Sequence, residues 1–164
     1  MVVRVFALCV LMFASVASAG HNELLIERVN AKFSYTWLAL DKTIKANGYK
    51  AAYLQRCDFA LNERHYKSDK YRILFFGQYD EMKRMSAKYP KLSPFFPLKI
   101  TVMEEGKHTL IIAAPPITLL PLVKTDEDRM LIFRWNEDMK NILKQVKNQR
   151  SEERRVGKEC RSRW

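Results

Sequence analysis

The stretch between residues 71 and 116 constrains the fold more than any other part of the chain. Residues 72–77, Arg-Ile-Leu-Phe-Phe-Gly, form a nearly continuous apolar run, which is typical of a strand buried on both faces. Residues 78–89 then follow the period of a helix, with apolar and charged residues on opposite sides. Because residues 98–103 alternate as a half-buried strand does, the stretch predicts strand, helix and strand in that order.

A hairpin is predicted to close this unit. Residues 104–107, Glu-Glu-Gly-Lys, have the chemistry of a tight turn because Gly106 is free to take a positive φ. The return strand, residues 108–114, ends at two prolines. The unit is typical of an α+β domain, and it contains no reaction motif.

The rest of the chain is expected to add two strands and two helices. Residues 23–29 and 49–55 have strand patterns, and Ser34 is the predicted N-cap of a helix that closes at Asn47-Gly48. Thr125 with Asp128 resembles a capping box at the start of a last helix. That helix is predicted to bury one apolar stripe, made of Ile132, Trp135, Met139, Ile142, Leu143 and Val146.

These elements predict the fold class. Their order, β-α-β-β-α-β-β-α, indicates a two-layer α+β fold with a mainly antiparallel sheet and helices packed on one face. Residues 20–149, about 130 in number, are enough for a single domain with its own core.

Both ends of the chain are expected to lie outside this domain. Residues 1–19 resemble a signal peptide, with a basic start, an apolar run and a small-residue site that predicts cleavage between Ala19 and Gly20. An uncleaved anchor is the alternative. Residues 150–164 match the in-frame translation of a short-read sequencing adapter, whereas the alternative is a solvated basic tail. We therefore exclude residues 1–19 and 150–164 from arguments about fold and function. The signal-peptide pattern of residues 1–19 predicts a periplasmic or secreted protein.

The charge balance is milder once both ends are set aside. The whole chain has 29 basic and 18 acidic residues, whereas the remaining part has 22 and 15. A modest positive field favours anionic partners, but no basic run interleaved with aromatic residues indicates nucleic-acid binding. Cys57 is the single cysteine of this part, so no internal disulfide is expected.

Several short motifs resemble those of a known family, the "domain of unknown function 302" family. The resemblance covers roughly residues 33–146 and implies a compact two-layer α+β fold with no established activity. This chain has Gln78-Tyr79 where many members carry Asn-Pro. The motifs are Lys45-Ala46-Asn47-Gly48-Tyr49, Phe76-Gly77, Lys88-Tyr89-Pro90, Phe96-Pro97-Leu98 and the proline after the hairpin.

A metal- or thiol-dependent enzyme or redox factor is one functional hypothesis. Residues 57–70 predict a polar loop with a short helix or an irregular strand, and Cys57, Glu63 and His65 lie in it. If Glu63 and His65 belonged to a strand, their spacing would place them on the same face, so a Cys/Glu/His metal site is conceivable. The bland alternative is a polar loop with an unreactive thiol.

The preferred hypothesis is a non-enzymatic binding or accessory protein that needs no cofactor. Its ligand would be a small apolar or amphiphilic molecule, or an unidentified protein partner, because the aromatic residues beside prolines suggest a pocket mouth or a contact surface. Adjacent residues of a strand point to opposite sides, so Phe95 and Phe96 are expected to face different surroundings. The candidate ligand-binding residues are Arg72, Phe76, Gly77, Phe95, Phe96 and Lys99.

Overall fold

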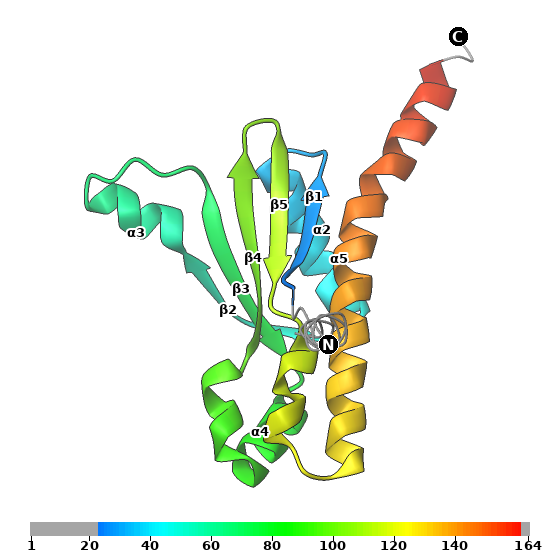
Figure 1. Ribbon diagram of the computed structural model, residues 1–164. Coiled ribbons are helices and arrows are strands. Elements are labelled where there is room, and N and C mark those ends of the chain that lie inside the picture. The colour runs from blue at the N-terminus through cyan, green and yellow to red at the C-terminus, as the bar shows by residue number, and fades with distance from the viewer. Residues whose placement is uncertain (1–22, 162–164) are drawn as a thin grey trace, which may run out of the picture.

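The computed structural model describes residues 23–161, of which residues 150–161 are described by their backbone alone. The predicted leader and its cleavage site therefore lie outside the described residues. The strands are β1 (Leu25–Val29), β2 (Lys50–Arg56), β3 (Tyr71–Gly77), β4 (Leu98–Glu105) and β5 (His108–Ala113). The α-helices are α2 (Phe33–Ala46), α3 (Cys57–Glu63), α4 (Tyr79–Lys88) and α5 (Asp126–Arg161), and two 3-10 helices are η2 (Pro90–Phe95) and η3 (Pro116–Leu122) (Figure 1).

The five strands form one sheet in the order β1-β5-β4-β3-β2, and every neighbouring pair is antiparallel. Helices α2 and α5 contact each other and pack against the same face of this sheet. The predicted α+β fold is therefore confirmed, with the extra helix α3 between β2 and β3. Helix α4 and the two 3-10 helices gather at one end of the sheet (Figure 1).

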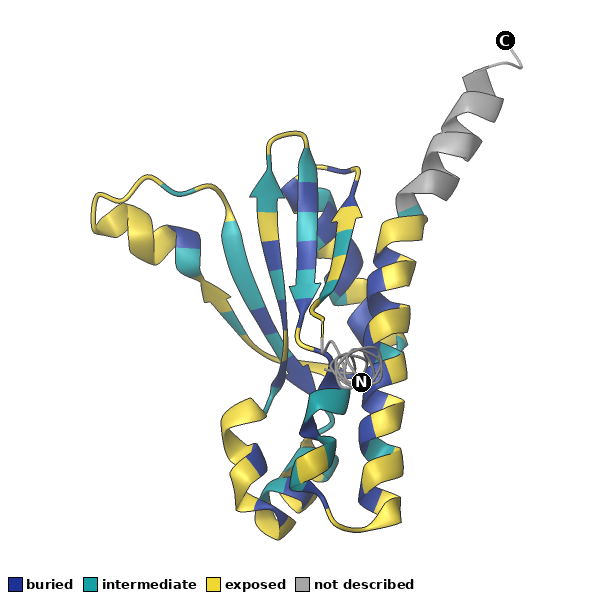
Figure 2. Ribbon diagram, viewed as in Figure 1, coloured by how far each residue is buried: buried dark blue, intermediate teal, exposed yellow. Residues whose placement is uncertain are grey.

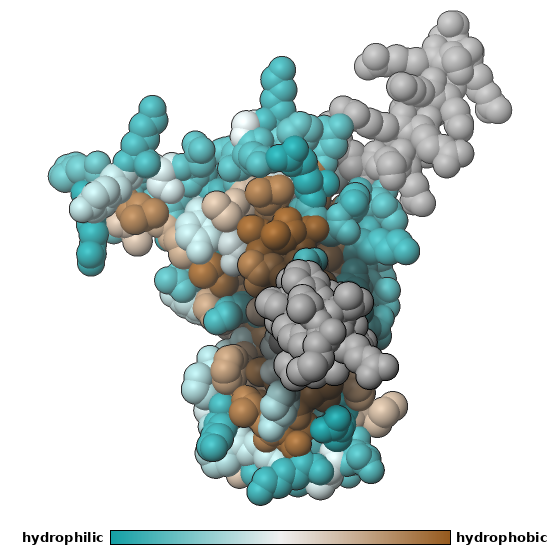
Figure 3. Space-filling model, in the orientation of Figure 1, coloured by the Kyte–Doolittle hydropathy of each residue, from teal (hydrophilic) through white to brown (hydrophobic). Residues whose placement is uncertain are grey.

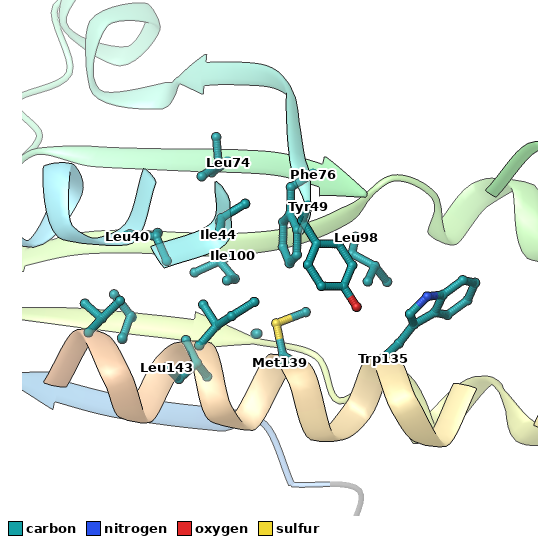
Figure 4. Packing of buried hydrophobic residues seen from close by; sticks show 14 of the residues in the cluster. Leu40, Ile44, Tyr49, Leu74, Phe76, Leu98, Ile100, Trp135, Met139 and Leu143 are labelled. Atoms are coloured by element: carbon teal, nitrogen blue, oxygen red, sulfur yellow. The ribbon is translucent and has the colours of Figure 1, made fainter. Parts of the chain in front are cut away.

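The core lies between the sheet and the two covering helices. The six residues of the predicted stripe on α5 are all buried. Figure 4 shows Met139 and Leu143 on the side of α5 that faces the sheet, near strand residues such as Ile100. The strands β4 and β5 alternate between buried and more accessible residues along their length (Figure 2). This alternation places one side chain in two in the core, which is the pattern of a sheet covered on one face.

Local predictions were mostly confirmed, with two errors. Strand β3 is not buried on both faces as predicted, because Tyr71, Ile73 and Phe75 are only half-buried on the face opposite the helices. The other error is at the start of α2. The β4–β5 turn places Gly106 at a φ of +57°, as the hairpin prediction required. Helix α2 begins at Phe33, however, so its N-cap is Lys32 and not Ser34. Lys32 makes no side-chain capping bond, and Ser34 lies inside the first helical turn. No helix among residues 23–161 combines the length and apolar character needed to cross a bilayer.

Candidate functional site

An open pocket of about 550 Å³ lies where α4 leaves the end of β3. Its walls come from the start of β2, the end of β3, helix α4 and the loop between η2 and β4. Lys50 pairs with Gly77 across the sheet, which brings the first two of these segments together. The volume falls within the roughly 300–1,000 Å³ that is usual for small-molecule sites.

The side chain of Met82 packs directly against Gly77, which has no side chain of its own. A Cβ atom on Gly77 would overlap the sulfur and terminal methyl of Met82, so glycine alone leaves room for this arrangement. Methionine is flexible and polarizable, and its side chain adapts readily to irregular apolar groups. The Gly77–Met82 contact therefore shapes the pocket, because both residues line it.

The lining is largely apolar, and its charged residues carry one sign. Phe96 supplies an aromatic wall, while Lys50 and Lys83 supply two exposed ammonium groups. The Lys83 Nζ atom lies 5.9 Å from the ring centroid of Tyr79, which is within the range of a cation–π contact. Ser86 adds a hydroxyl group from α4. This arrangement suits a molecule with an apolar body and an anionic head group.

The aromatic wall is fixed by contacts with α5. The rings of Phe96 and Trp135 meet edge to face, with centroids 5.4 Å apart. Trp135 Nε1 donates a 2.9 Å hydrogen bond to Glu81 Oε2, and the same carboxylate forms an ion pair with Arg134. The start of α4 and the pocket wall are therefore held against the same turn of α5.

The other end of α4 is anchored by a fully buried carboxylate, Asp128. Its oxygens accept hydrogen bonds from Arg84 (2.8 Å), Lys88 (2.6 Å), the Tyr89 hydroxyl (2.8 Å) and the Thr125 hydroxyl (2.5 Å). Burial alone would raise the pKa of Asp128. The hydrogen bonds from Lys88, Thr125, Tyr89 and Arg84 outweigh that effect and hold the pKa well below its usual range. Asp128 therefore stays ionised and ties α4 to α5.

The structure divides the six predicted ligand-binding residues among four places. Gly77 and Phe96 line the pocket, whereas Phe95 and Lys99 line a separate groove of about 50 Å³ near η3. The two phenylalanines face different surroundings, but not for the expected reason, because Phe95 ends the 3-10 helix η2 and Phe96 follows it, so neither lies on a strand. Phe76 is buried in the core, where its ring meets the edge of Tyr49.

Arg72 does not line the pocket with Phe96. It lies near the start of β3, whereas the pocket is at Gly77, the end of that strand. Its guanidinium carbon is 5.0 Å from the ring centroid of Phe33 and 5.7 Å from that of Trp37, both on α2. Arg72 was predicted to bind the same ligand as Phe95 and Phe96, and the structure does not bring its guanidinium group to them. Its position follows from the alternation of β3, which turns Arg72, like Leu74 and Phe76, toward the helices.

Sequence reasoning missed most of the pocket-lining residues. The sequence does contain a local pattern that groups Met82, Lys83 and Ser86. Ser86 is four residues after Met82 and three after Lys83, so the helical period of α4 puts it on the same face as each of them. Lys50 has no such signal. It reaches the pocket only because β2 pairs with β3, and that pairing joins residues far apart in the chain.

The Cys57, Glu63 and His65 hypothesis finds no support in the geometry. These residues do not share a strand, because α3 covers Cys57–Glu63 and His65 follows it in a turn with a φ of +64°. Within the part of the chain that the structure describes, no group of three His, Cys, Asp or Glu side chains is arranged to hold a metal ion. Burial raises the pKa of the Cys57 thiol, and the Asp58 carboxylate adds to this effect, which disfavours the reactive thiolate.

The sheet, its two covering helices and the pocket at one end define an α+β protein built on one five-stranded antiparallel sheet. The family model described as "Domain of unknown function DUF302" matches residues 26–147. This chain therefore belongs to the DUF302 family, as the sequence motifs suggested.

A solved structure is similar to this chain over most of its length. The crystal structure of an uncharacterized conserved protein DUF302 from Bacillus stearothermophilus superposes with a TM-score of 0.60 at 18% sequence identity. The match covers 76% of this chain and 95% of that chain, which supports the fold. No curated protein matches the sequence.

Proposed function

We propose that the protein is a non-enzymatic binding protein that holds a small amphiphilic anion in the pocket beside α4. The single observation that carries this proposal is the composition of the pocket. Apolar and aromatic walls would receive a hydrocarbon or ring system, and Lys50 and Lys83 would attract a carboxylate, sulfonate or phosphate head group.

The rigidity of the pocket supports the same proposal. Helix α4 is tied to α5 at Glu81 and again at Asp128, so its pocket-lining face is held in place before any ligand arrives. A preformed site loses little conformational entropy on binding, so more of the contact energy is available for affinity. The adaptable part is Met82, whose side chain is able to change rotamer around ligands of different shape.

Binding of this kind would take place outside the cytoplasm. The support for export is the signal-peptide pattern of residues 1–19, with a basic residue, an apolar run and a small-residue site. Expression with the native leader followed by N-terminal sequencing of the exported product would test it. A product that begins at Gly20 is expected, and a product that keeps Met1 would contradict cleavage.

The ligand proposal is tested with 1-anilinonaphthalene-8-sulfonate, an aromatic anion, as the fluorescent probe and decanoate as the competitor. We expect one saturable site, with the probe released by decanoate. Ser86→Phe places a ring in the pocket from the exposed side of α4 and should abolish the signal. Lys83→Glu should weaken binding by about tenfold, because it replaces an attraction with a repulsion.

Lys42→Glu is the matched control, because it makes the same charge change on an exposed residue of α2 that does not line the pocket. Its affinity should equal that of the wild type. Equal weakening by Lys42→Glu would mean that the probe senses only net charge. Undiminished binding to Ser86→Phe would place the probe elsewhere on the molecule, and either result overturns the proposal.

A further inference from the structure

Among the described residues, 23–161, no helix covers the second face of the sheet. Helices α2 and α5 pack on one side, and the opposite side of β1, β5 and β4 is turned toward the viewer in Figure 1. Figure 3 shows apolar surface gathered over these strands. We call this side the open face of the sheet.

The strand register shows which residues share the open face. One row across the sheet contains Ile26, Ile112, Thr101 and Ile73, and the next contains Arg28, Leu110, Met103 and Tyr71. Ile26 is 54% exposed and Met103 is 36% exposed, while the other apolar members of the two rows are half-buried. The centre of the face is therefore apolar and free of charge, and Arg28 lies at its edge on β1.

The size of the open face matches what a weak dimer needs. Five strands about 4.8 Å apart, with about six residues each at roughly 3.3 Å, give a face of roughly 24 by 20 Å, or about 500 Å². Two such faces together would cover roughly 1,000 Å², which is the lower limit for a specific interface and exceeds most crystal contacts. The apolar part of the face is smaller than this area, and an apolar patch of a few hundred Å² on a protein surface is often a functional contact.

The charges at the two ends of the face favour a second copy of the same chain. Lys99 lies at one end of β4, and Glu105 lies about 20 Å away at the other end, where it pairs with Arg28 at 2.6 Å. A twofold axis perpendicular to the strands would place the Lys99 end of each copy over the Glu105 end of the other. Such an isologous arrangement would bring each Lys99 over the Arg28–Glu105 pair of the other copy, where it would share the Glu105 carboxylate with Arg28 beside an apolar centre.

We infer that the open face is the interface of a homodimer in which two sheets pack face to face with their β4 strands antiparallel. The face-to-face distance would be about 10 Å, as in β-sandwiches. The residues of the two central rows do not line the pocket beside α4, so this inference does not depend on the proposed ligand.

The inference is tested by sedimentation equilibrium of the chain with its own N-terminal residues in place. Protein concentrations should run from about 1 to about 300 µM. The wild type should change from monomer to dimer across this range. Met103→Lys puts two charges into the centre of the interface and should weaken the dimer by more than about a hundredfold. Ile26→Lys, on an edge strand and already exposed, should act in the same direction if Met103→Lys proves unstable.

Leu38→Lys is the matched control, because Leu38 is 68% exposed on α2, the helix that covers the opposite face. This variant should dimerise as the wild type does. Lys99→Glu should weaken the dimer several-fold at low salt, and an unchanged dimer would contradict the antiparallel orientation. A wild type that stays monomeric would overturn the inference and leave the face to residues 1–22 or to another partner. A dimer that survives both Met103→Lys and Ile26→Lys would overturn it as well.

Discussion

The buried carboxylate of Asp128 gives the most quantitative prediction. In Asp128→Ala the hydroxyl group of Tyr89 loses its charged hydrogen-bond acceptor. Tyr89 is only 8% exposed, so water does not replace that acceptor, and the loss should lower the free energy of unfolding by about 2 kcal/mol. The loss of a negative charge in the first turn of α5 adds about 0.5–1 kcal/mol. Arg84 and Lys88 are nearly half exposed, so water replaces much of what they lose.

The expected total is a decrease of about 3 kcal/mol in the free energy of unfolding, which is a large share of the roughly 5–15 kcal/mol typical of a domain. For a domain of this size the midpoint of thermal unfolding should fall by about 10 °C. Urea unfolding followed by circular dichroism measures the free energy directly. Helix α4 should also lose hydrogen-exchange protection first, because Asp128 holds its C-terminal end.

Glu127→Ala is the matched control. Glu127 is the neighbouring acid in the same helical turn, its side chain is 80% exposed, and it lies 3.7 Å from the same Arg84. Its removal should cost less than about 1 kcal/mol, because exposed ion pairs contribute little. Equal losses of stability in the two variants would refute the argument that burial makes Asp128 important.

The pH dependence has a definite sign. Because the pKa of Asp128 in the folded protein is lowered, its ionised form stabilises the fold above the unfolded-state pKa of about 3.9. This stabilisation is lost as the pH falls toward the folded-state pKa. The difference in stability between the wild type and Asp128→Ala should therefore be constant near neutral pH and should narrow below about pH 5. A difference that stays constant to pH 2.5 would contradict this mechanism.

Two further predictions concern the pocket and the lone thiol. Gly77→Ala should push the Met82 side chain further into the pocket and weaken probe binding, because the new methyl group takes the place of the Met82 sulfur and methyl. Gly77→Ala combined with Met82→Ala should recover binding. Loss of binding that the double variant does not relieve would count against a steric cause. Cys57 should react with iodoacetamide more slowly than a free cysteine at pH 7, because its pKa is raised and less thiolate is present. The rate should still be rising with pH beyond about pH 8.5, the pKa of a free cysteine, and a rate already maximal at pH 7 would mean that the thiol is activated.

The sequence predicts the fold well wherever the signal is local. The period of two in residues 98–103 and the helical stripe of α5 depend only on backbone geometry and on burial of one side, so both elements were found correctly. The turn at Gly106 follows from the same kind of local chemistry. The start of α2 was misplaced by local reasoning, because no capping side chain marks it.

The candidate site was predicted only in part. Gly77 and Phe96 were singled out and line the pocket, but Phe76, Arg72, Phe95 and Lys99 lie elsewhere. The predicted set came from two short segments, residues 72–77 and residues 95–99. Neighbours on a strand point to opposite faces, so proximity in sequence spreads residues among different surroundings instead of collecting them.

Asp128 shows most clearly where the information in the sequence ends. The pairing of Thr125 with Asp128 was predicted, because a capping residue and its partner are three positions apart. The three donors that arrive from α4 and Tyr89 lie about forty residues away, and only the packing of α4 against α5 brings them to the same carboxylate. The sequence alone thus determined the five strands, the helices α2, α4 and α5 and their order, which follow from the periodicity of neighbouring residues. The pocket, the buried anchor and the open face were decided by tertiary structure, because each depends on which distant segments come into contact.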